Sequence, residues 1–236
     1  MGSTTTTAAV HTRDNSSVTA GLERRLLIWI ARRLPASVNS DHLSALGLAS
    51  MAAAGLSFAT FRATPWAAVA VIVSLAANWF GDSLDGTVAR VREQQRPRYG
   101  FYVDHVIDIA GTTLLVAGLA LSGLMNPMVA LAVLVGFLLV SSETYLATHA
   151  AGVFKMSFLG FGPTELRLLL MVGALRAAHS PFVEPFGGEP LRLFDIGGVV
   201  AAFALTMTFV IASLRNTRAL YLAEPMPVRA DDRRVA

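Results

Sequence analysis

The sequence predicts an all-α, polytopic membrane protein with six transmembrane helices, preceded by an amphipathic helix at the membrane interface. Three observations predict this class. Only 15% of the 236 residues are charged, whereas about 25% is usual for soluble domains. Long apolar runs recur along the chain, and most basic residues fall on one side of them. A soluble enzyme is therefore disfavoured.

The chain ends are expected to differ from the domain between them. Residues 1–18 are polar and lack the apolar core of a signal peptide, which predicts a disordered cytoplasmic leader. The apolar residues between Leu22 and Leu34 alternate with four arginines, a pattern suited to an interfacial helix on an anionic surface. We expect the six-helix membrane domain over residues 19–223 and a disordered cytoplasmic tail over 224–236.

Five uncharged runs of 17 to 19 residues are close to the length needed to cross the hydrocarbon core: 43–60, 65–81, 109–125, 126–142 and 196–214. A further run, 163–179, is interrupted by Glu165, Arg167 and Arg176, but Pro163 suits the first turn of a helix. We include this run as the fifth of six spans in chain order.

The distribution of basic residues predicts the orientation. With six spans and a cytoplasmic N-terminus, 15 of the 19 Lys and Arg residues are cytoplasmic. Arg62, Arg176 and Arg192 fall outside, and Arg167 lies near the inner end of the fifth span. Five spans would move the five arginines of the C-terminal tail outside, so this alternative is disfavoured.

Four aspartates border the membrane core at helical spacing. Asp82 and Asp85 stand three residues apart at the end of the second span, and Asp104 and Asp108 stand four apart at the start of the third. A charged residue at mid-membrane costs roughly 2.5 to 3.5 kcal/mol on insertion scales, so these carboxylates should face a polar interior near the cytoplasm. The two helices are expected to be antiparallel neighbours whose acidic faces meet.

The chemistry of these residues indicates a metal-bound phosphate. Four neighbouring carboxylates repel one another, and one or two divalent cations would remove that repulsion. The chain has no cysteine, and oxygen ligands favour Mg²⁺ or Mn²⁺. Gly86 and Ala89 leave room beside the acids, and arginines at 90, 92, 96 and 98 surround them with positive charge. Taken singly, small residues in membrane helices more often serve helix packing. Arginines in loops more often reflect only the excess of positive charge on the cytoplasmic side.

The pattern Asp82-x₂-Asp85-Gly86-x₂-Ala89-Arg90-x₉-Gly100-x₃-Asp104-x₃-Asp108 resembles the signature of the CDP-alcohol phosphotransferases, membrane enzymes of phospholipid synthesis. The resemblance implies that an alcohol hydroxyl attacks the β-phosphorus of a CDP-linked donor and releases CMP. It implies two bound Mg²⁺ or Mn²⁺ ions, with ligands Asp82, Asp85, Asp104 and Asp108. It further implies Asp108 as the base, with His105 as an alternative base, and nucleotide or phosphate contacts from Gly86, Ala89, Arg90 and Gly100.

The start of the first span extends the resemblance. Asn39-Ser40-Asp41-His42-Leu43-Ser44 is similar to a family segment near the cytidine, with Asp41 in place of an asparagine. Ser40 and Asp41 are therefore nucleotide-binding candidates. An N-cap at Ser40 or Asp41 is the competing structural interpretation.

Two donor classes remain open. The short chain and the six spans resemble bacterial members that transfer phosphatidyl groups from CDP-diacylglycerol to a small polar alcohol, which is our leading interpretation and places the protein in a bacterial cytoplasmic membrane. The alternative is a choline/ethanolamine phosphotransferase, which uses diacylglycerol as acceptor. Features similar to those enzymes are His105 and the segments that contain Glu143, Tyr145 and Glu165. Glu143, Tyr145, His149 and Glu165 are the candidates for acceptor or headgroup contacts; otherwise they solvate the end of one helix and cap the next.

Partners and competing functions complete the expectations. The resemblance implies membrane lipids as surroundings and a homodimer, for which small residues at 49–55 and 197–204 offer close helix packing. No nucleic-acid partner is expected. A cation transporter would also bury carboxylates, but usually nearer the midplane and with internal repeats, and a non-catalytic scaffold would need no acidic pattern.

Overall fold

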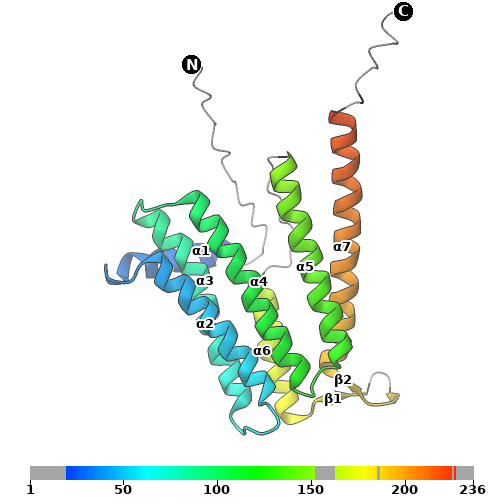
Figure 1. Ribbon diagram of the computed structural model, residues 1–236. Helices are drawn as coiled ribbons and strands as arrows, with labels where there is room; N and C mark the ends of the chain where they lie inside the picture. Colours follow the sequence, from blue (N-terminus) through cyan, green and yellow to red (C-terminus); the bar gives the residue numbers. More distant parts are fainter. Residues whose placement is uncertain (1–19, 152–162, 185–186, 225, 227–236) are drawn as a thin grey trace, which may run out of the picture.

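The computed structural model describes residues 20–151, 163–184, 187–224 and 226, and these form helices joined by short connections and one hairpin (Figure 1). The helices are α1 (Ala20–Arg33), α2 (Ser40–Ala59), α3 (Ala67–Val91), α4 (Pro97–Leu121), α5 (Pro127–Ala151), α6 (Pro163–His179) and α7 (Leu193–Ala223). Strands β1 (Phe182–Val183) and β2 (Leu191–Arg192) pair antiparallel just before α7. The predicted leader and nearly all of the predicted tail lie outside the described residues.

The expected all-α membrane class is confirmed. Within the described part of the chain, five helices are long and apolar enough to cross a membrane, namely α2, α3, α4, α5 and α7. Helix α6 has the predicted bounds, Pro163–His179, but with 17 residues it is not among these five. The sixth crossing therefore stays a prediction.

The N-cap of the first span lies one residue before the earlier of the two predicted cap positions. Asn39, rather than Ser40 or Asp41, is the N-cap of α2: its side-chain oxygen accepts from the His42 backbone N–H at 2.9 Å. In return, the Asn39 backbone N–H donates to His42 Nδ1 at 3.4 Å, which completes a capping box. Capping is thus supplied by Asn39 and His42, and Ser40 and Asp41 are available for other contacts.

Helix α2 is the centre of the packing. Both α3 and α4 pack along α2, whereas α3 and α4 barely touch each other; the expected direct pairing of α3 with α4 is therefore replaced by a shared partner. Glycine allows the close approach on both sides. A Cβ on Gly81 of α3 would lie 2.6 Å from the Leu43 carbonyl oxygen, and one on Gly118 of α4 would lie 2.0 Å from that of Gly55. Part of the 49–55 stretch, proposed above for a dimer, thus packs inside the chain.

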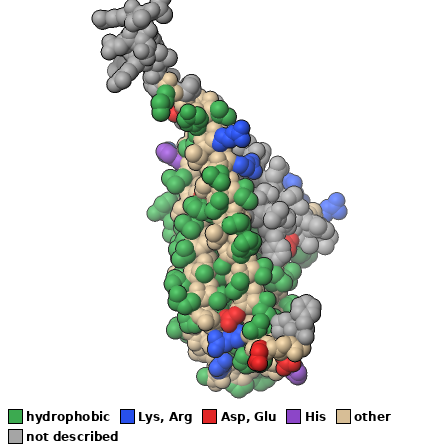
Figure 2. All heavy atoms as spheres, turned by 90° about the vertical axis from the view of Figure 1, so that its right-hand side faces the viewer, with side chains coloured by type: hydrophobic (Ala, Val, Ile, Leu, Met, Phe, Trp, Pro, Cys, Tyr) green, Lys and Arg blue, Asp and Glu red, His purple; other side chains and the backbone are tan. Residues whose placement is uncertain are grey.

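Helices α5 and α7 run parallel. Near their starts, the Asn126 N–H donates to Asp195 Oδ1 at 2.5 Å, and further along Asn216 donates to Glu143 at 2.6 Å. Helix α6 packs mainly against α3. The outward face of α7 is hydrophobic over its length, with charged side chains near the ends (Figure 2); its exposed residues include Val199, Phe203 and Ile211. Such a surface is suited to lipid.

Helix α1 runs crosswise to the long helices (Figure 1). Its buried Leu27 and Ala31 form a cluster with Leu43 of α2 and Leu84 and Val88 of α3. On its other side Leu26 and Trp29 are exposed, and Arg33 stacks 3.9 Å above the Trp29 ring. A helix thus occupies the predicted segment, and its role as an amphipathic helix at the membrane interface stays a prediction.

Candidate active site

The four aspartates belong to the second half of α3 and the first half of α4, and the connection between these two helices lies at the end of the bundle opposite the β1–β2 hairpin (Figure 1). Asp82 and Asp85 are one turn apart on α3, and Asp104 and Asp108 are one turn apart on α4. The carboxylate of Asp85 is within electrostatic range of those of Asp82 and Asp104. The acidic faces of α3 and α4 therefore approach each other although the helix backbones are held apart by α2.

Asp82 and Asp85 have different protein partners. Oδ2 of Asp82 accepts from Arg167 on α6 at 2.5 Å, and Arg167 also donates from Nε to Asn78 Oδ1 at 2.7 Å. Oδ2 of Asp85 accepts from the Ser44 hydroxyl on α2 at 2.6 Å, and its Oδ1 accepts from the Gly86 N–H at 2.5 Å. Each carboxylate of α3 is thus oriented by hydrogen bonds before any ligand is considered.

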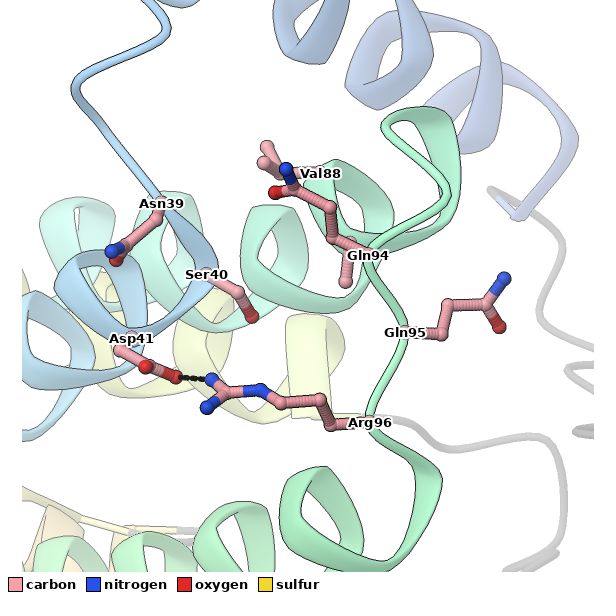
Figure 3. Close-up of a pocket in the computed structure, with 8 residues that line it drawn as sticks. Asn39, Ser40, Asp41, Val88, Gln94, Gln95 and Arg96 are labelled. Atoms are coloured by element: carbon pink, nitrogen blue, oxygen red, sulfur yellow. Dashed lines mark hydrogen bonds and ion pairs between the residues drawn. The ribbon is translucent and has the colours of Figure 1, made fainter.

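A pocket of about 440 Å³ reaches Ala89, one helical turn beyond Asp85 on α3, and its volume is within the range of roughly 300 to 1,000 Å³ typical of small-molecule sites. Figure 3 shows the start of α2 on one wall and the α3–α4 connection on the other. Its lining residues are Asn39, Ser40, Asp41, Val88, Ala89, Gln94, Gln95 and Arg96. Three predicted nucleotide contacts, Ser40, Asp41 and Ala89, are therefore brought together.

The ion pair between Arg96 and Asp41 joins the two walls of this pocket (Figure 3). The hydrogen bond to Asp41 raises the pKa of Arg96 above its already high usual value. Arg96 therefore remains a cation, and its guanidinium also lies 4.0 Å from the centre of the Tyr99 ring. Because Asp41 balances this charge, an anionic ligand would have to share or displace the carboxylate of Asp41 in order to bind Arg96.

The other predicted phosphate contacts lie around the pocket. Ala89 and Gly86 share a helical face with the α3 aspartates, and Arg90 donates to Thr87 at 3.1 Å on the same helix. A Cβ on Gly86 would meet only the Arg90 guanidinium, at 3.4 Å. A Cβ on Gly100 would meet nothing within 4 Å. The backbone at both glycines is thus open to a ligand.

On α4, the two candidate bases differ in their accessibility. Asp108 is exposed, whereas His105 is 8% exposed. His105 Nδ1 lies 2.6 Å from the Phe101 carbonyl oxygen. A carbonyl only accepts, so Nδ1 carries the proton, and the remaining ring nitrogen, Nε2, is buried from solvent.

The predicted acceptor residues do not form one cluster. Tyr145 of α5 packs edge-on against His105, with ring centres 4.9 Å apart, and lies within electrostatic range of Asp104 and Asp108. Glu143 instead accepts from Asn216 of α7, and His149 is exposed near the end of α5. Glu165 is partly buried near the start of α6. The structure thus brings Tyr145 next to the aspartates.

Comparison with known protein families identifies the family of this chain. The family model described as CDP-alcohol phosphatidyltransferase matches residues 41–210, which is more than half of the chain and includes all four aspartates. The chain belongs to this family. Its members are transferases of phospholipid synthesis, so the transporter alternative has no support from the match. A comparison with curated proteins gives no significant match.

The oxygen donors of the four aspartates fit the divalent cation on which the family generally depends. The acidic faces offer carboxylate oxygens, the ligands that Mg²⁺ and Mn²⁺ prefer. Within the described residues, no three Asp, Glu or His side chains already converge as a metal-holding group. Asp82 is turned toward Arg167 and Asp85 toward Ser44, so cation binding would require these carboxylates to share or exchange partners.

Sequence reasoning missed several residues at this site. From the sequence, Arg167 is only an interruption of an apolar run and a charge near the inner end of the fifth span, whereas in the structure it lies near the start of α6 and contacts Asp82. Asn78 precedes Asp82 by four residues, and this spacing could have identified a shared partner. Ser44 belongs to the segment at the start of the first span that resembles the family but is assigned no role of its own, and Gln94 and Gln95 have no distinguishing pattern.

Proposed function

We propose that the protein transfers a phosphatidyl group from CDP-diacylglycerol to a small polar alcohol. In this reaction the alcohol oxygen bonds to the β-phosphorus, the bond from that phosphorus to CMP breaks, and the hydroxyl proton passes to a carboxylate. The family match supports this class of reaction. The observation that carries it is the pocket of about 440 Å³ at the start of α2, whose lining includes Ala89, one helical turn from Asp85.

Helix α2 explains how the donor would be aligned. Ser40 and Asp41 line the pocket, and Ser44, one turn on from Ser40, donates to Asp85. A nucleotide held by the start of α2 would therefore place its phosphates toward the acids of α3. Gly86 and Ala89 leave space there, and Arg90 and Arg96 supply positive charge. Mg²⁺ or Mn²⁺ held by Asp82, Asp85, Asp104 and Asp108 would neutralise the pyrophosphate and the departing CMP.

Asp108 is our choice for the base. Its side chain is exposed on α4, where an acceptor hydroxyl has access to it. Burial of His105 Nε2, together with the bond from Nδ1 to the Phe101 carbonyl, supports a packing role for His105 instead. A base within hydrogen-bond reach of the reacting hydroxyl contributes roughly 10²- to 10⁴-fold to the rate.

One observation favours the second donor class. His105 and Tyr145, the residues that resemble choline/ethanolamine phosphotransferases, are in ring contact, and Phe101 lies 4.1 Å from His105 on the other side. Aromatic faces attract quaternary ammonium groups. Transfer of phosphocholine or phosphoethanolamine to diacylglycerol is therefore the alternative.

The proposed topology has six spans, with both termini and the active site in the cytoplasm. Because α5 and α7 are parallel, the chain has to return between them, and α6 with its flanking residues provides that return. Pairing of Arg167 with Asp82 reduces the penalty of a charge within α6. The excess of arginines near the acidic end supports its cytoplasmic side, and a bacterial inner membrane is the proposed setting.

The deciding experiment measures CMP release by purified protein with Mg²⁺ or Mn²⁺. CDP-diacylglycerol with a panel of small alcohols is compared with CDP-choline or CDP-ethanolamine plus diacylglycerol. Turnover with CDP-diacylglycerol alone supports the proposal, and turnover with a CDP-aminoalcohol alone supports the alternative. No CMP release with any donor would overturn both the proposal and the alternative.

The base is tested in the same assay. Asp108→Asn should lower kcat by about 10² to 10⁴, whereas His105→Asn should lower it much less. Glu189→Gln, an exposed carboxylate beside the hairpin at the other end of the bundle, is the matched control. Unchanged turnover by Asp108→Asn would show that the base lies elsewhere.

A further inference from the structure

Arg167 is the basic residue most closely engaged with the acidic site, and it comes from outside the signature. Its side chain is only 13% exposed. The same edge of its guanidinium contacts two residues of α3: Nε donates to Asn78 Oδ1 at 2.7 Å, and Nη2 donates to Asp82 Oδ2 at 2.5 Å. Because Asn78 and Asp82 are four residues apart, both acceptors lie on one face of α3.

Asn78 fixes the orientation of this arginine. Asn78 is buried, with 4% of the residue exposed. Its side-chain Nδ2 donates to the Gly47 carbonyl oxygen at 3.0 Å. The amide nitrogen is thereby directed to α2, which leaves Oδ1 as the acceptor for Arg167. A continuous chain of hydrogen bonds therefore runs from the α2 backbone through Asn78 and Arg167 to the carboxylate of Asp82.

This arrangement limits what Asp82 can do. Arg167 takes one of the two lone pairs of Oδ2, so Oδ1 is the less hindered oxygen of Asp82 for a further ligand. The guanidinium also adds one fixed positive charge beside four carboxylates. The planar guanidinium of arginine makes both contacts at once, whereas the single ammonium group of a lysine could not reproduce this paired geometry.

We propose that Arg167 is a positioning residue that holds Asp82 by one oxygen, restricts it to single-oxygen ligation of a divalent cation, and weakens cation binding while aligning the site for turnover. This inference rests on the proposed function, since it assigns Asp82 as a cation ligand. It makes an unusual prediction: loss of Arg167 strengthens cation binding and slows the reaction. A residue that only stabilised the fold would weaken both.

The test uses the full-length protein in detergent. Mn²⁺ binding is titrated by the electron paramagnetic resonance signal of the free ion, and CMP release gives kcat and the donor KM. For Arg167→Gln we expect the Mn²⁺ Kd to fall about tenfold, because the nearby positive charge is removed. We expect kcat to fall about a hundredfold, with the donor KM changing much less.

Two further variants isolate the role of the guanidinium. Arg167→Lys keeps the charge but not the double contact, so its Mn²⁺ Kd should stay near the wild-type value while kcat falls about tenfold. Arg176→Gln is the matched control: it lies on the same helix, is exposed, and bonds to backbone carbonyls at the other end, so binding and turnover should be unchanged.

The outcomes are separable. Weaker Mn²⁺ binding in Arg167→Gln, or wild-type kcat and Kd, overturns the inference and leaves the proposed function intact. If Arg167→Gln does not fold, Arg167→Lys decides: a lowered kcat at unchanged Kd supports the inference, and a wild-type kcat overturns it. If the wild type neither binds Mn²⁺ nor releases CMP, the proposed function fails and this inference fails with it.

Discussion

Helices α2, α3 and α4 are joined by backbone contact, whereas α5 and α7 are joined by side chains. Helix α3 buries nine of its 25 residues, and α7 buries two of its 31. Gly81 and Gly118 allow the α2 backbone to touch both neighbours. Between α5 and α7 the contacts include the Glu143–Asn216 hydrogen bond and the packing of Leu205 beside Gly136.

The difference matters because the two parts have different proposed tasks. The aspartates and the pocket belong to the close-packed α2–α3–α4 unit, where small movements of the backbone are resisted. Three of the four acceptor candidates belong to α5. The comparison therefore suggests a rigid unit that fixes the donor and the cations, and a more adaptable pair of helices that meets the acceptor.

The largest expected effect compares one glycine from each part. Gly118→Ala should lower the free energy of unfolding by about 3 kcal/mol, because its Cβ would overlap the Gly55 carbonyl oxygen and backbone cannot easily give way. Gly136→Ala should change it by less than about 1 kcal/mol, since the nearest atom is the Leu205 Cβ at 3.0 Å. Unfolding in mixed micelles titrated with SDS measures both. Equal losses would contradict the distinction between the two parts.

Arg92 offers a second test of the donor unit. It donates to the carbonyl oxygens of Val38, Leu34 and Pro35 at 2.6, 2.9 and 3.1 Å, and thereby ties the end of α3 to the linker that leads into the pocket. Arg92→Gln should destabilise the protein by about 2 kcal/mol and raise the donor KM several-fold, with little change in kcat. Arg98→Gln, an exposed change in the first turn of α4, is the control. A fall in kcat alone would show that Arg92 acts on chemistry instead.

Gly86 tests whether the donor approaches the α3 backbone. A Cβ there fits the protein, so Gly86→Ala should leave stability unchanged or raise it by up to about 1 kcal/mol. The methyl group would occupy donor space and raise the donor KM about tenfold, which corresponds to about 1.4 kcal/mol. Gly197→Ala on α7, where nothing lies within 4 Å, should give the stability change without the KM change. An unaltered donor KM would remove Gly86 from the binding site.

Sequence reasoning reached the helices and the acidic faces because both depend on local periodicity. The apolar runs predict where helices lie, and the spacing of Asp82, Asp85, Asp104 and Asp108 predicts which side chains share a face. The sequence offers Ser40 or Asp41 as a cap of α2, whereas the structure places the cap at Asn39, because Asn and Ser are both good N-caps. The reciprocal bond, in which the Asn39 backbone N–H donates to His42 Nδ1, favours Asn39.

The remaining features depend on which helices touch. That α2 separates α3 from α4 follows from where the glycines Gly81 and Gly118 meet it, and no single helix reveals its partner. Arg167 was hidden for the same reason: within α6 it is an interruption of an apolar run, and only packing of α6 on α3 turns it into the partner of Asp82. Pairing between distant helices is a tertiary property.

Tyr145 gives the smallest expected effect and bears on the adaptable part. Its ring packs against His105, its hydroxyl hydrogen bonds with Ser141, and it lies near Asp104 and Asp108. Tyr145→Phe keeps the ring contact and removes one hydroxyl, so the acceptor KM should rise about threefold while the donor KM and kcat stay near wild type. Tyr221→Phe, exposed on α7, should change nothing. If Tyr145→Phe raised the donor KM instead, α5 would belong with the donor unit, and the division of the molecule into a donor part and an acceptor part would have to be redrawn.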